Sequence, residues 1–185
     1  AFFPDWQPSV VPQHRSWLVP DHYDEASGFL KLSVHSWLIT IGGKRILIDT
    51  CVGNHKPRPH FERFNMLDTP WLQRLEAAGV RPEQVDYVMC THLHVDHVGW
   101  NTRLENGRWV PTFPKAKYVF HKREYDYWEA ATKRGDNPPG QVWTMNCLPI
   151  VEAGQALLVD DDYALDDTIT AGFHDSGALY DLAKP

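Results

Sequence analysis

The chain has 185 residues, of which 43% are hydrophobic and 23% are charged. This composition is typical of a folded globular protein and excludes an intrinsically disordered one, and the length suffices for one domain with a substantial core. The net charge of -6 gives no electrostatic advantage on nucleic acid, so no DNA or RNA partner is expected. No apolar run approaches the ~20 residues that a membrane-spanning helix needs, so no membrane partner is expected.

The N-terminal segment and the cysteines bear on where the protein resides. Residues 1–27 are rich in Pro, Trp and His without a clear period, and we expect them to form a wrapping arm. They contain no basic segment followed by an apolar one, so an intact signal peptide is not expected. The cysteines Cys51, Cys90 and Cys147 form no CxxC pair and are odd in number, which favours reduced thiols in the cytoplasm.

The first predicted strands lie on either side of Gly42-Gly43. Residues 29–41 are mostly β-branched or apolar with partial alternation, and residues 45–49 form a second short apolar run. Two such runs around a Gly-Gly turn predict a β-hairpin. Residues 52–68 contain Lys-Pro-Arg-Pro and are predicted to form a surface loop, because proline cannot continue a helix.

A helix and a strand follow this loop. Thr69-Pro70 matches a helix start, with Thr as the N-cap and Pro at the first helical position, and Gly79 is a suitable stop. Residues 85–90 form an apolar run that predicts a strand. This strand leads directly into a cluster of histidines.

The remaining pattern alternates strands with helices. Residues 117–120 predict a strand and residues 124–131 a helix, and further strands are predicted at residues 156–159 and near Ile169. Strands that alternate with helices and are joined by long loops indicate an α/β chain. We expect residues 1–185 to form a single domain of this class.

Four potential metal ligands lie close together: His92, His94, Asp96 and His97. In extended backbone, residues two apart project to the same face, so the imidazoles of His92 and His94 can reach one ion. A turn at Asp96 and His97, which Gly99 makes easy, lets both face a second ion. Imidazole and carboxylate are ligands that zinc favours, and iron, manganese and cobalt accept them too.

The alternative is a set of unconnected histidines in a surface loop. Leu93 and Val95 alternate with the potential ligands and can anchor the segment in the core, and a predicted strand precedes it. This arrangement favours the metal site.

The residues around this histidine cluster resemble the motif of a known family. Residues 91–99, Thr-His-Leu-His-Val-Asp-His-Val-Gly, are similar to the His-x-His-x-Asp-His signature of the metallo-β-lactamase fold hydrolases. The branch resembles the one that contains the quorum-quenching lactonases and the methyl parathion hydrolases. The resemblance runs from about residue 33 to about residue 169. The resemblance implies a fold of α/β (α+β) class, an αββα sandwich whose second half is incomplete. Residues 170–185 would be a divergent or truncated C-terminal end of this domain.

The resemblance also implies a role for each residue of the motif. His92 and His94 would belong to a first metal site, and Asp96 and His97 to a second one. Asp49, at the end of a predicted strand, would orient one of the ligands. The alternative for Asp49 is an acid that caps the strand end.

The C-terminal part departs from the family pattern. His174 keeps the His-x-x-Gly spacing with Gly177 and is the candidate third ligand of the first site, while the alternative is a solvent-exposed histidine. Ala178 stands where the family pattern has a further His. Asp181 is the only local candidate for the family's bridging Asp. Because the sequence ends at Pro185, we expect a fragment, a truncated product or a rearranged C-terminus.

These features predict a metal-dependent hydrolase with one or two zinc ions that cleaves an ester-like bond of a small molecule, a lactone or small ester being favoured. Metal-bound hydroxide would attack the carbonyl or phosphoryl centre, and Asp96 would orient it and help to move the proton to the leaving group. One alternative is a truncated, catalytically impaired metal-binding domain of the same fold. Another is an iron-dependent thiol oxygenase or a nuclease on this scaffold, and the acidic net charge disfavours the nuclease. The oligomeric state stays open.

Overall fold

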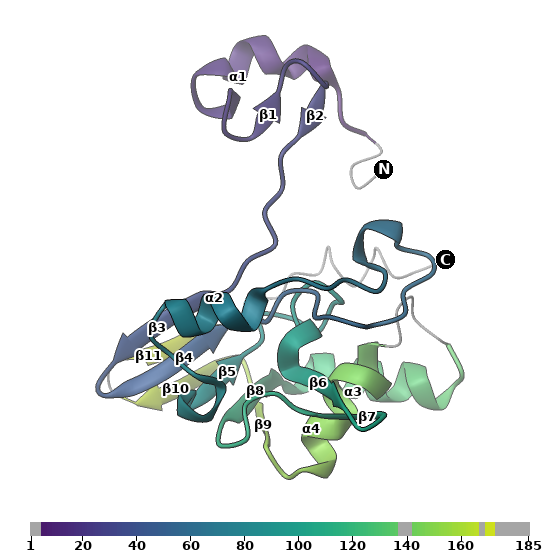
Figure 1. Ribbon diagram of the computed structural model, residues 1–185. Helices are drawn as coiled ribbons and strands as arrows, with labels where there is room; N and C mark the ends of the chain where they lie inside the picture. Colours follow the sequence, from purple (N-terminus) through teal and green to yellow (C-terminus); the bar gives the residue numbers. More distant parts are fainter. Residues whose placement is uncertain (1–4, 137–141, 167–168, 173–185) are drawn as a thin grey trace. The chain divides into compact units, whose positions relative to one another are not determined.

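The computed structural model describes residues 5–136, 142–166 and 169–172 (Figure 1). The chain separates into two compact units, Ala1–Val34 and His35–Pro185. The candidate ligands His174 and Asp181 lie outside the described residues. Within the described part of the chain, no helix is both long and apolar enough to cross a membrane.

The first unit contains short elements that the sequence prediction of an arm missed. A 3-10 turn leads into helix α1, which begins just before a proline that suits a first helical turn. Two short strands then pair in antiparallel fashion. These elements are η1 (Pro8–Val10), α1 (Val11–Leu18), β1 (Tyr23–Asp24) and β2 (Phe29–Leu30). Val11, Leu18 and Tyr23 form a small core of their own, so the segment has local structure although its sequence shows no clear period.

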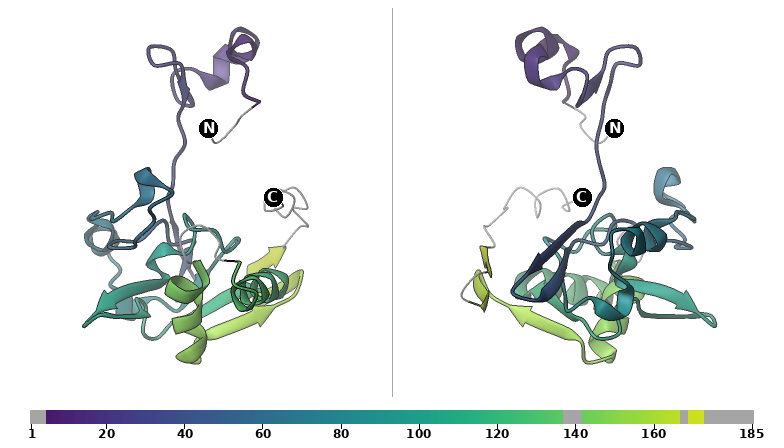
Figure 2. Two further views of the ribbon diagram at one scale, coloured as in Figure 1. Left: turned by 90° about the vertical axis from the view of Figure 1, so that its right-hand side faces the viewer. Right: turned by 60° about the vertical axis from the view of Figure 1, so that its left-hand side comes forward.

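The second unit is built on a five-stranded sheet in the order β3-β4-β5-β8-β9. The first two strands form the predicted hairpin, and Gly42 and Gly43 turn the chain with positive φ angles of 56° and 75°. The other neighbours are parallel, and β9 is an edge strand (Figure 2, yellow-green). The strands are β3 (Trp37–Ile41), β4 (Lys44–Ile48), β5 (Tyr87–Met89), β8 (Lys117–His121) and β9 (Ala156–Val159).

The side chains of alternate residues in these strands are buried on opposite faces of the sheet. Leu47, Val88 and Tyr118 pack into the large core that also contains Leu75 of α2 and Trp128 of α3. The neighbouring residues of the same strands, Ile46, Met89 and Val119, form a smaller core on the other face. The helices are α2 (Trp71–Ala77), α3 (Lys122–Lys133) and α4 (Leu148–Glu152), and the π-helical turn η5 (Trp143–Cys147) precedes α4.

Most predicted elements are present, with shifts at their ends. Helix α2 has Pro70 as its N-cap, so the predicted cap at Thr69 is wrong by one residue. The Arg74 N–H donates to the Pro70 carbonyl at 3.0 Å, so the helix starts there. The Thr69 N–H and hydroxyl donate to Asn54 Oδ1 at 3.0 and 3.1 Å, and the hydroxyl does not cap the helix. The 3-10 turns η2 (Glu62–Phe64) and η3 (Pro82–Gln84) flank this helix.

Two further hairpins complete the unit. One turns at Asn106-Gly107, where Gly107 has a positive φ of 79°, and it follows the turn η4 (Gly99–Asn101). The other continues from β9. Their strands are β6 (Thr102–Glu105), β7 (Arg108–Pro111), β10 (Asp162–Asp166) and β11 (Ile169–Gly172). The mixture of parallel strands and covering helices confirms the predicted α/β class.

Candidate metal centre

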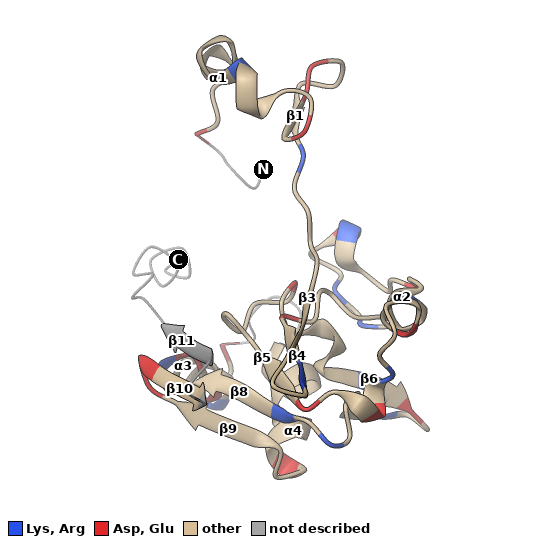
Figure 3. Ribbon diagram, turned by 90° about the vertical axis from the view of Figure 1, so that its left-hand side faces the viewer, with Lys and Arg blue, Asp and Glu red and all other residues tan. Residues whose placement is uncertain are grey.

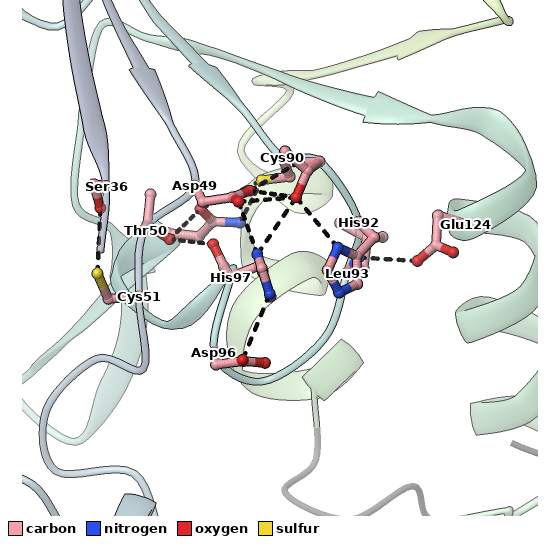
Figure 4. A network of polar contacts seen from close by, with 12 residues as sticks. Ser36, Asp49, Thr50, Cys51, Cys90, His92, Leu93, Asp96, His97 and Glu124 are labelled. Atoms are coloured by element: carbon pink, nitrogen blue, oxygen red, sulfur yellow. Dashed lines mark hydrogen bonds and ion pairs between the residues drawn. The ribbon is translucent and has the colours of Figure 1, made fainter. Parts of the chain in front are cut away.

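The histidine motif lies where the parallel strands β4 and β5 end. Asp49 follows β4 and Thr91 follows β5, and the two strands are neighbours in register. The Asp49 backbone N–H donates to the carbonyl of Met89 at 2.9 Å, so the pairing continues beyond the strands. In open α/β sheets the carboxyl ends of parallel strands are the usual place for a ligand. The site therefore occupies the position that this fold favours (Figure 4).

The loops that leave these two strands cross each other closely. The Thr50 N–H donates to the carbonyl of His97 at 2.6 Å, and the Gly99 N–H donates to the carbonyl of Cys51 at 2.7 Å. A Cβ atom on Gly99 would lie 1.8 Å from the carbonyl carbon of Val52. Only glycine permits this approach, so Gly99 allows the second half of the motif to lie against the loop that carries Asp49.

Asp49 binds both ends of the motif loop. Its Oδ1 accepts the Thr91 backbone N–H at 2.8 Å, and its Oδ2 accepts the Thr91 hydroxyl at 2.8 Å. Oδ2 also lies 2.7 Å from His97 Nδ1. Asp49 adopts a left-handed conformation, with φ of 59°, which is uncommon for a residue other than glycine and which these bonds support. The orienting role of Asp49 stays a prediction, but the Asp49 carboxylate lies within hydrogen-bond distance of the His97 imidazole.

His97 lies between two carboxylates. Its Nδ1 faces Asp49, and its Nε2 lies 3.5 Å from Asp96 Oδ2. Burial alone would lower the pKa of His97, but the hydrogen bonds and charges of Asp49 and Asp96 raise it to about 9. Burial likewise works to raise the pKa of Asp96, but the hydrogen bond and charge of His97 prevail and lower it. Without a metal ion, these contacts therefore favour a protonated His97 beside an ionised Asp96.

His92 and His94 are in the opposite state. Burial, together with repulsion from His97 and His94, lowers the pKa of His92 to about 4, and burial lowers the pKa of His94. The ring centroid of His92 lies 4.7 Å from that of His94 and 3.9 Å from that of His97. Neutral imidazoles have a nitrogen lone pair free for a metal ion. Both rings therefore offer the donor that zinc binding requires.

By donor chemistry these residues fit a transition-metal ion. Three imidazoles and a carboxylate gather at one place, and burial lowers the pKa values of His92 and His94, which favours their neutral forms. No three His, Cys, Asp or Glu side chains enclose a point suited to an ion within the described ranges. His97 accounts for part of this, because both of its ring nitrogens face carboxylates. A metal ion at His97 would have to displace a proton.

The turn predicted for the motif is present. The His97 N–H donates to the carbonyl of His94 at 3.0 Å, which reverses the chain at Asp96. Leu93 is 1% exposed and belongs to the large core, and Val95 packs against that core. These contacts anchor the motif as the sequence pattern predicts.

Three polar residues near the motif were missed by the sequence reasoning. Glu124 of α3 accepts the backbone N–H of Leu93 at 2.9 Å, and only its place in a predicted helix gave a signal. Lys56 and Arg58 are fully buried, so the prediction of a surface loop is wrong for them. Prolines on either side of Arg58 do exclude a helix, but the sequence gives no sign that this irregular backbone turns inward.

Comparison with known proteins agrees with the motif. Residues 30–180 match the family described as the metallo-beta-lactamase superfamily, which is most of the chain. The chain belongs to the metallo-β-lactamase superfamily.

Several relatives of this metallo-β-lactamase chain are known. The N-acyl homoserine lactonase AttM of Azorhizobium caulinodans is 35% identical over 60 residues, which are 32% of this chain and 19% of that protein. A probable metal-dependent hydrolase from Staphylococcus aureus has a similar fold, with a TM-score of 0.62 at 20% identity, over 84% of this chain and 54% of its own. AidC, a dizinc quorum-quenching lactonase, gives 0.57 at 19% identity, over 85% and 50%. The chain thus spans about half the length of these solved structures.

Proposed function

We propose that this superfamily member is a metal-dependent hydrolase that cleaves an ester-like bond of a small molecule, with lactones and small esters as its substrate class. The observation that carries the proposal is the convergence of His92, His94 and His97 at the carboxyl end of the parallel strands, with Asp49 and Asp96 on His97. The similarity to a lactonase over 60 residues supports the substrate class.

Zinc is the proposed metal, as one or two ions, and iron, manganese or cobalt would suit the same donors. His92 and His94 would hold the first ion, with His174 as the proposed third ligand. Asp96 and His97 would hold the second. When bound, zinc polarises the bond to be cleaved and lowers the pKa of water, which supplies a nucleophile at neutral pH.

The residues of the chain have separate tasks in this proposal. Asp49 fixes the tautomer and the orientation of His97 through Nδ1, and Thr91 in turn holds Asp49. In the metal-free chain the hydrogen bond and charge of His97 lower the pKa of Asp96 despite burial, and with an ion bound the charge of the metal would keep this carboxylate ionised. Its carboxylate orients the attacking water and moves a proton to the leaving group.

The proposed partner is a small-molecule substrate, with no nucleic acid and no membrane. Lys and Arg are interspersed with Asp and Glu along the described chain (Figure 3), and the net charge is -6. Cys51, Cys90 and Cys147 are buried and free, which supports a cytoplasmic location.

The test measures metal content and hydrolysis together. Purified protein is loaded with zinc and assayed on a lactone, an aryl ester and a phosphotriester. His94→Ala should lower both bound zinc and hydrolysis, and His60→Ala, which changes an exposed histidine, should change neither. Protein that binds no stoichiometric metal and hydrolyses none of the three substrates would refute the proposal.

The same samples separate the alternatives. A catalytically impaired domain binds zinc without turnover of any substrate. An iron-dependent thiol oxygenase contains iron and consumes oxygen when a thiol is added, which an oxygen electrode detects.

A further inference from the structure

Glu124 of α3 reaches the peptide that joins two histidines of the motif. Its Oε2 accepts the backbone N–H of Leu93 at 2.9 Å, and Leu93 lies between His92 and His94 (Figure 4). The same oxygen accepts the indole N–H of Trp128 at 3.2 Å. One carboxylate therefore joins α3 to the middle of the motif.

The Leu93 N–H needs such a partner because the backbone around it is irregular. Residues 91–94 belong to no strand or helix, so no regular hydrogen-bond pattern supplies an acceptor. Leu93 as a whole residue is 1% exposed, so its amide is shielded from water. An ionised acceptor makes a shorter and stronger bond than a neutral one. Glu124 thus holds the His92–Leu93 peptide, which is one of the two peptide groups between the two histidines.

Helix α3 is arranged to hold Glu124 in place. His121 caps the helix, and Glu124 lies in its first turn, where the helix dipole favours a carboxylate. Trp128 follows four residues later on the same face and donates to Glu124. The Trp128 ring also lies edge-on to His94, with centroids 5.8 Å apart. The helix therefore contacts the motif through both its backbone and an imidazole.

We propose that Glu124 is a positioning residue that fixes the Leu93 peptide and thereby sets the relative placement of the His92 and His94 imidazoles for one metal ion. This inference rests on the proposed metal site. Glu124 acts through the backbone and is not itself a ligand.

Three variants test the inference by zinc titration of metal-free protein against a competing chelator. Glu124→Ala removes the acceptor, and Glu124→Gln keeps an oxygen without the charge. The matched control is Glu129→Ala on the same helix, because Glu129 interacts with Lys133, at 2.9 Å, and with Tyr125 rather than with the motif. Loss of a group that orients metal ligands typically weakens binding ~10-fold or more, so this is expected for Glu124→Ala, with a loss of about threefold for Glu124→Gln. Glu129→Ala should leave zinc affinity unchanged.

A second measurement uses the metal-free protein and does not depend on zinc. Hydrogen exchange at the Leu93 amide should accelerate in Glu124→Ala and, to a smaller degree, in Glu124→Gln, while the Leu47 amide in the sheet keeps its rate. Unchanged exchange at Leu93 in the folded variants would overturn the inference. If Glu124→Ala does not fold, the exchange rate of the Leu93 amide in Glu124→Gln is the test: a faster rate supports the inference and an unchanged rate overturns it.

The two measurements separate the two proposals. If wild-type protein binds no zinc, the proposed function fails, while the exchange rates still show whether Glu124 fixes the peptide. If zinc binds and its affinity is the same in Glu124→Ala, the proposed function stands and the positioning role of Glu124 is refuted.

Discussion

Two loops leave the carboxyl ends of the neighbouring strands β4 and β5. Basic side chains lie wholly or partly buried in both, but within the described residues they have acidic partners in only one of them. In the motif loop, residues 90–101, His97 lies between Asp49 and Asp96, so its charge has an acid on each side. In the loop of residues 49–68, Lys56 and Arg58 are both fully buried, and neither forms an ion pair within the described part of the chain.

The two buried cations rely on weaker partners. Lys56 Nζ donates to Thr102 Oγ1 at 2.9 Å and lies 3.7 Å from the ring centroid of Trp109. Arg58 Nη2 donates to the Val52 carbonyl at 2.9 Å, and its Nε and Nη1 are buried without a partner in the described structure. Burial lowers the pKa of Lys56 to about 6 and that of Arg58 to about 10.

The comparison shows that the two loops contribute differently to stability. Paired charges in the motif loop support its conformation, whereas burial of Lys56 and Arg58 without an ion pair destabilises the folded state, because a buried cation loses its hydration and Lys56 gives up a proton that the unfolded chain keeps. The Asp96 charge favours the charged form of Arg58, so the two loops are also coupled electrostatically. Substitutions in each loop test this difference.

The largest effect is expected where the two loops cross. In Gly99→Ala the new Cβ would lie 1.8 Å from the Val52 carbonyl carbon, so the backbones must separate and the bonds between residues 50–51 and 97–99 are lost. We expect the free energy of unfolding to fall by about 3 kcal/mol, with loss of zinc binding. Urea unfolding and zinc titration measure the two effects.

Gly79→Ala is the control for Gly99→Ala. Gly79 has a positive φ of 88°, but a Cβ there would meet nothing within 4 Å. Only the conformational strain of about 1 kcal/mol is expected, with zinc binding intact. Equal destabilisation by the two substitutions would mean that the close crossing of the loops is not needed.

This crossing also marks how far the sequence could predict the site. The alternation of His92, Leu93 and His94 predicted which side chains face the site and which face the core, because burial and local backbone geometry decide it. The contact between Gly99 and Val52 joins residues far apart in the chain, and no local pattern encodes it. The same holds for Glu124, whose partner Leu93 is 31 residues away.

The fold shows the same division between local and distant information. The hairpin at Gly42-Gly43 was predicted from its turn residues, and Asn106-Gly107 between β6 and β7 is a local turn signal of the same kind. The local structure of residues 8–30 was missed because its short elements show no period. The burial of Lys56 and Arg58 depends on tertiary contacts, so a sequence with prolines and cations there predicted a surface loop.

The next effect concerns the pH dependence of stability. The folded-state pKa of Lys56 is about 6, below the ordinary value of 10.5, so between these values the unfolded chain binds the proton that the folded chain lacks. Stability should therefore rise with pH across this range. Between pH 7 and 9 the unfolding free energy of wild type should rise by about 2.6 kcal/mol more than that of Lys56→Met, because folding releases nearly one proton throughout these two pH units.

Urea unfolding of metal-free wild type and Lys56→Met at both pH values measures this difference, and the contributions of all other groups cancel to a first approximation. Arg58 opposes protonation of Lys56 and the Cys147 thiol favours it. The face of the Trp109 ring also favours the charged form. A difference between the two proteins that stays constant with pH would show that Lys56 is charged in the folded state.

The smallest effect is expected at Thr102, which connects Lys56 to η5. Its hydroxyl accepts from Lys56 Nζ and donates to the Met145 carbonyl at 2.5 Å. Thr102→Val should lower the unfolding free energy by about 1 kcal/mol, because both buried groups lose a partner, while Thr102→Ser keeps the hydroxyl and should retain most of the stability.

The same substitution in Lys56→Met isolates the contact between the two side chains. There the cost of Thr102→Val should be smaller, because no ammonium or amine is left without an acceptor. A cost that is equal in both backgrounds would mean that Thr102 supports only Met145. The Trp109 ring would then be the one described contact that stabilises Lys56. The buried amino group of Lys56 would have even less compensation for its burial than the hydrogen bond to Thr102 implies, in contrast to His97 with its two carboxylates.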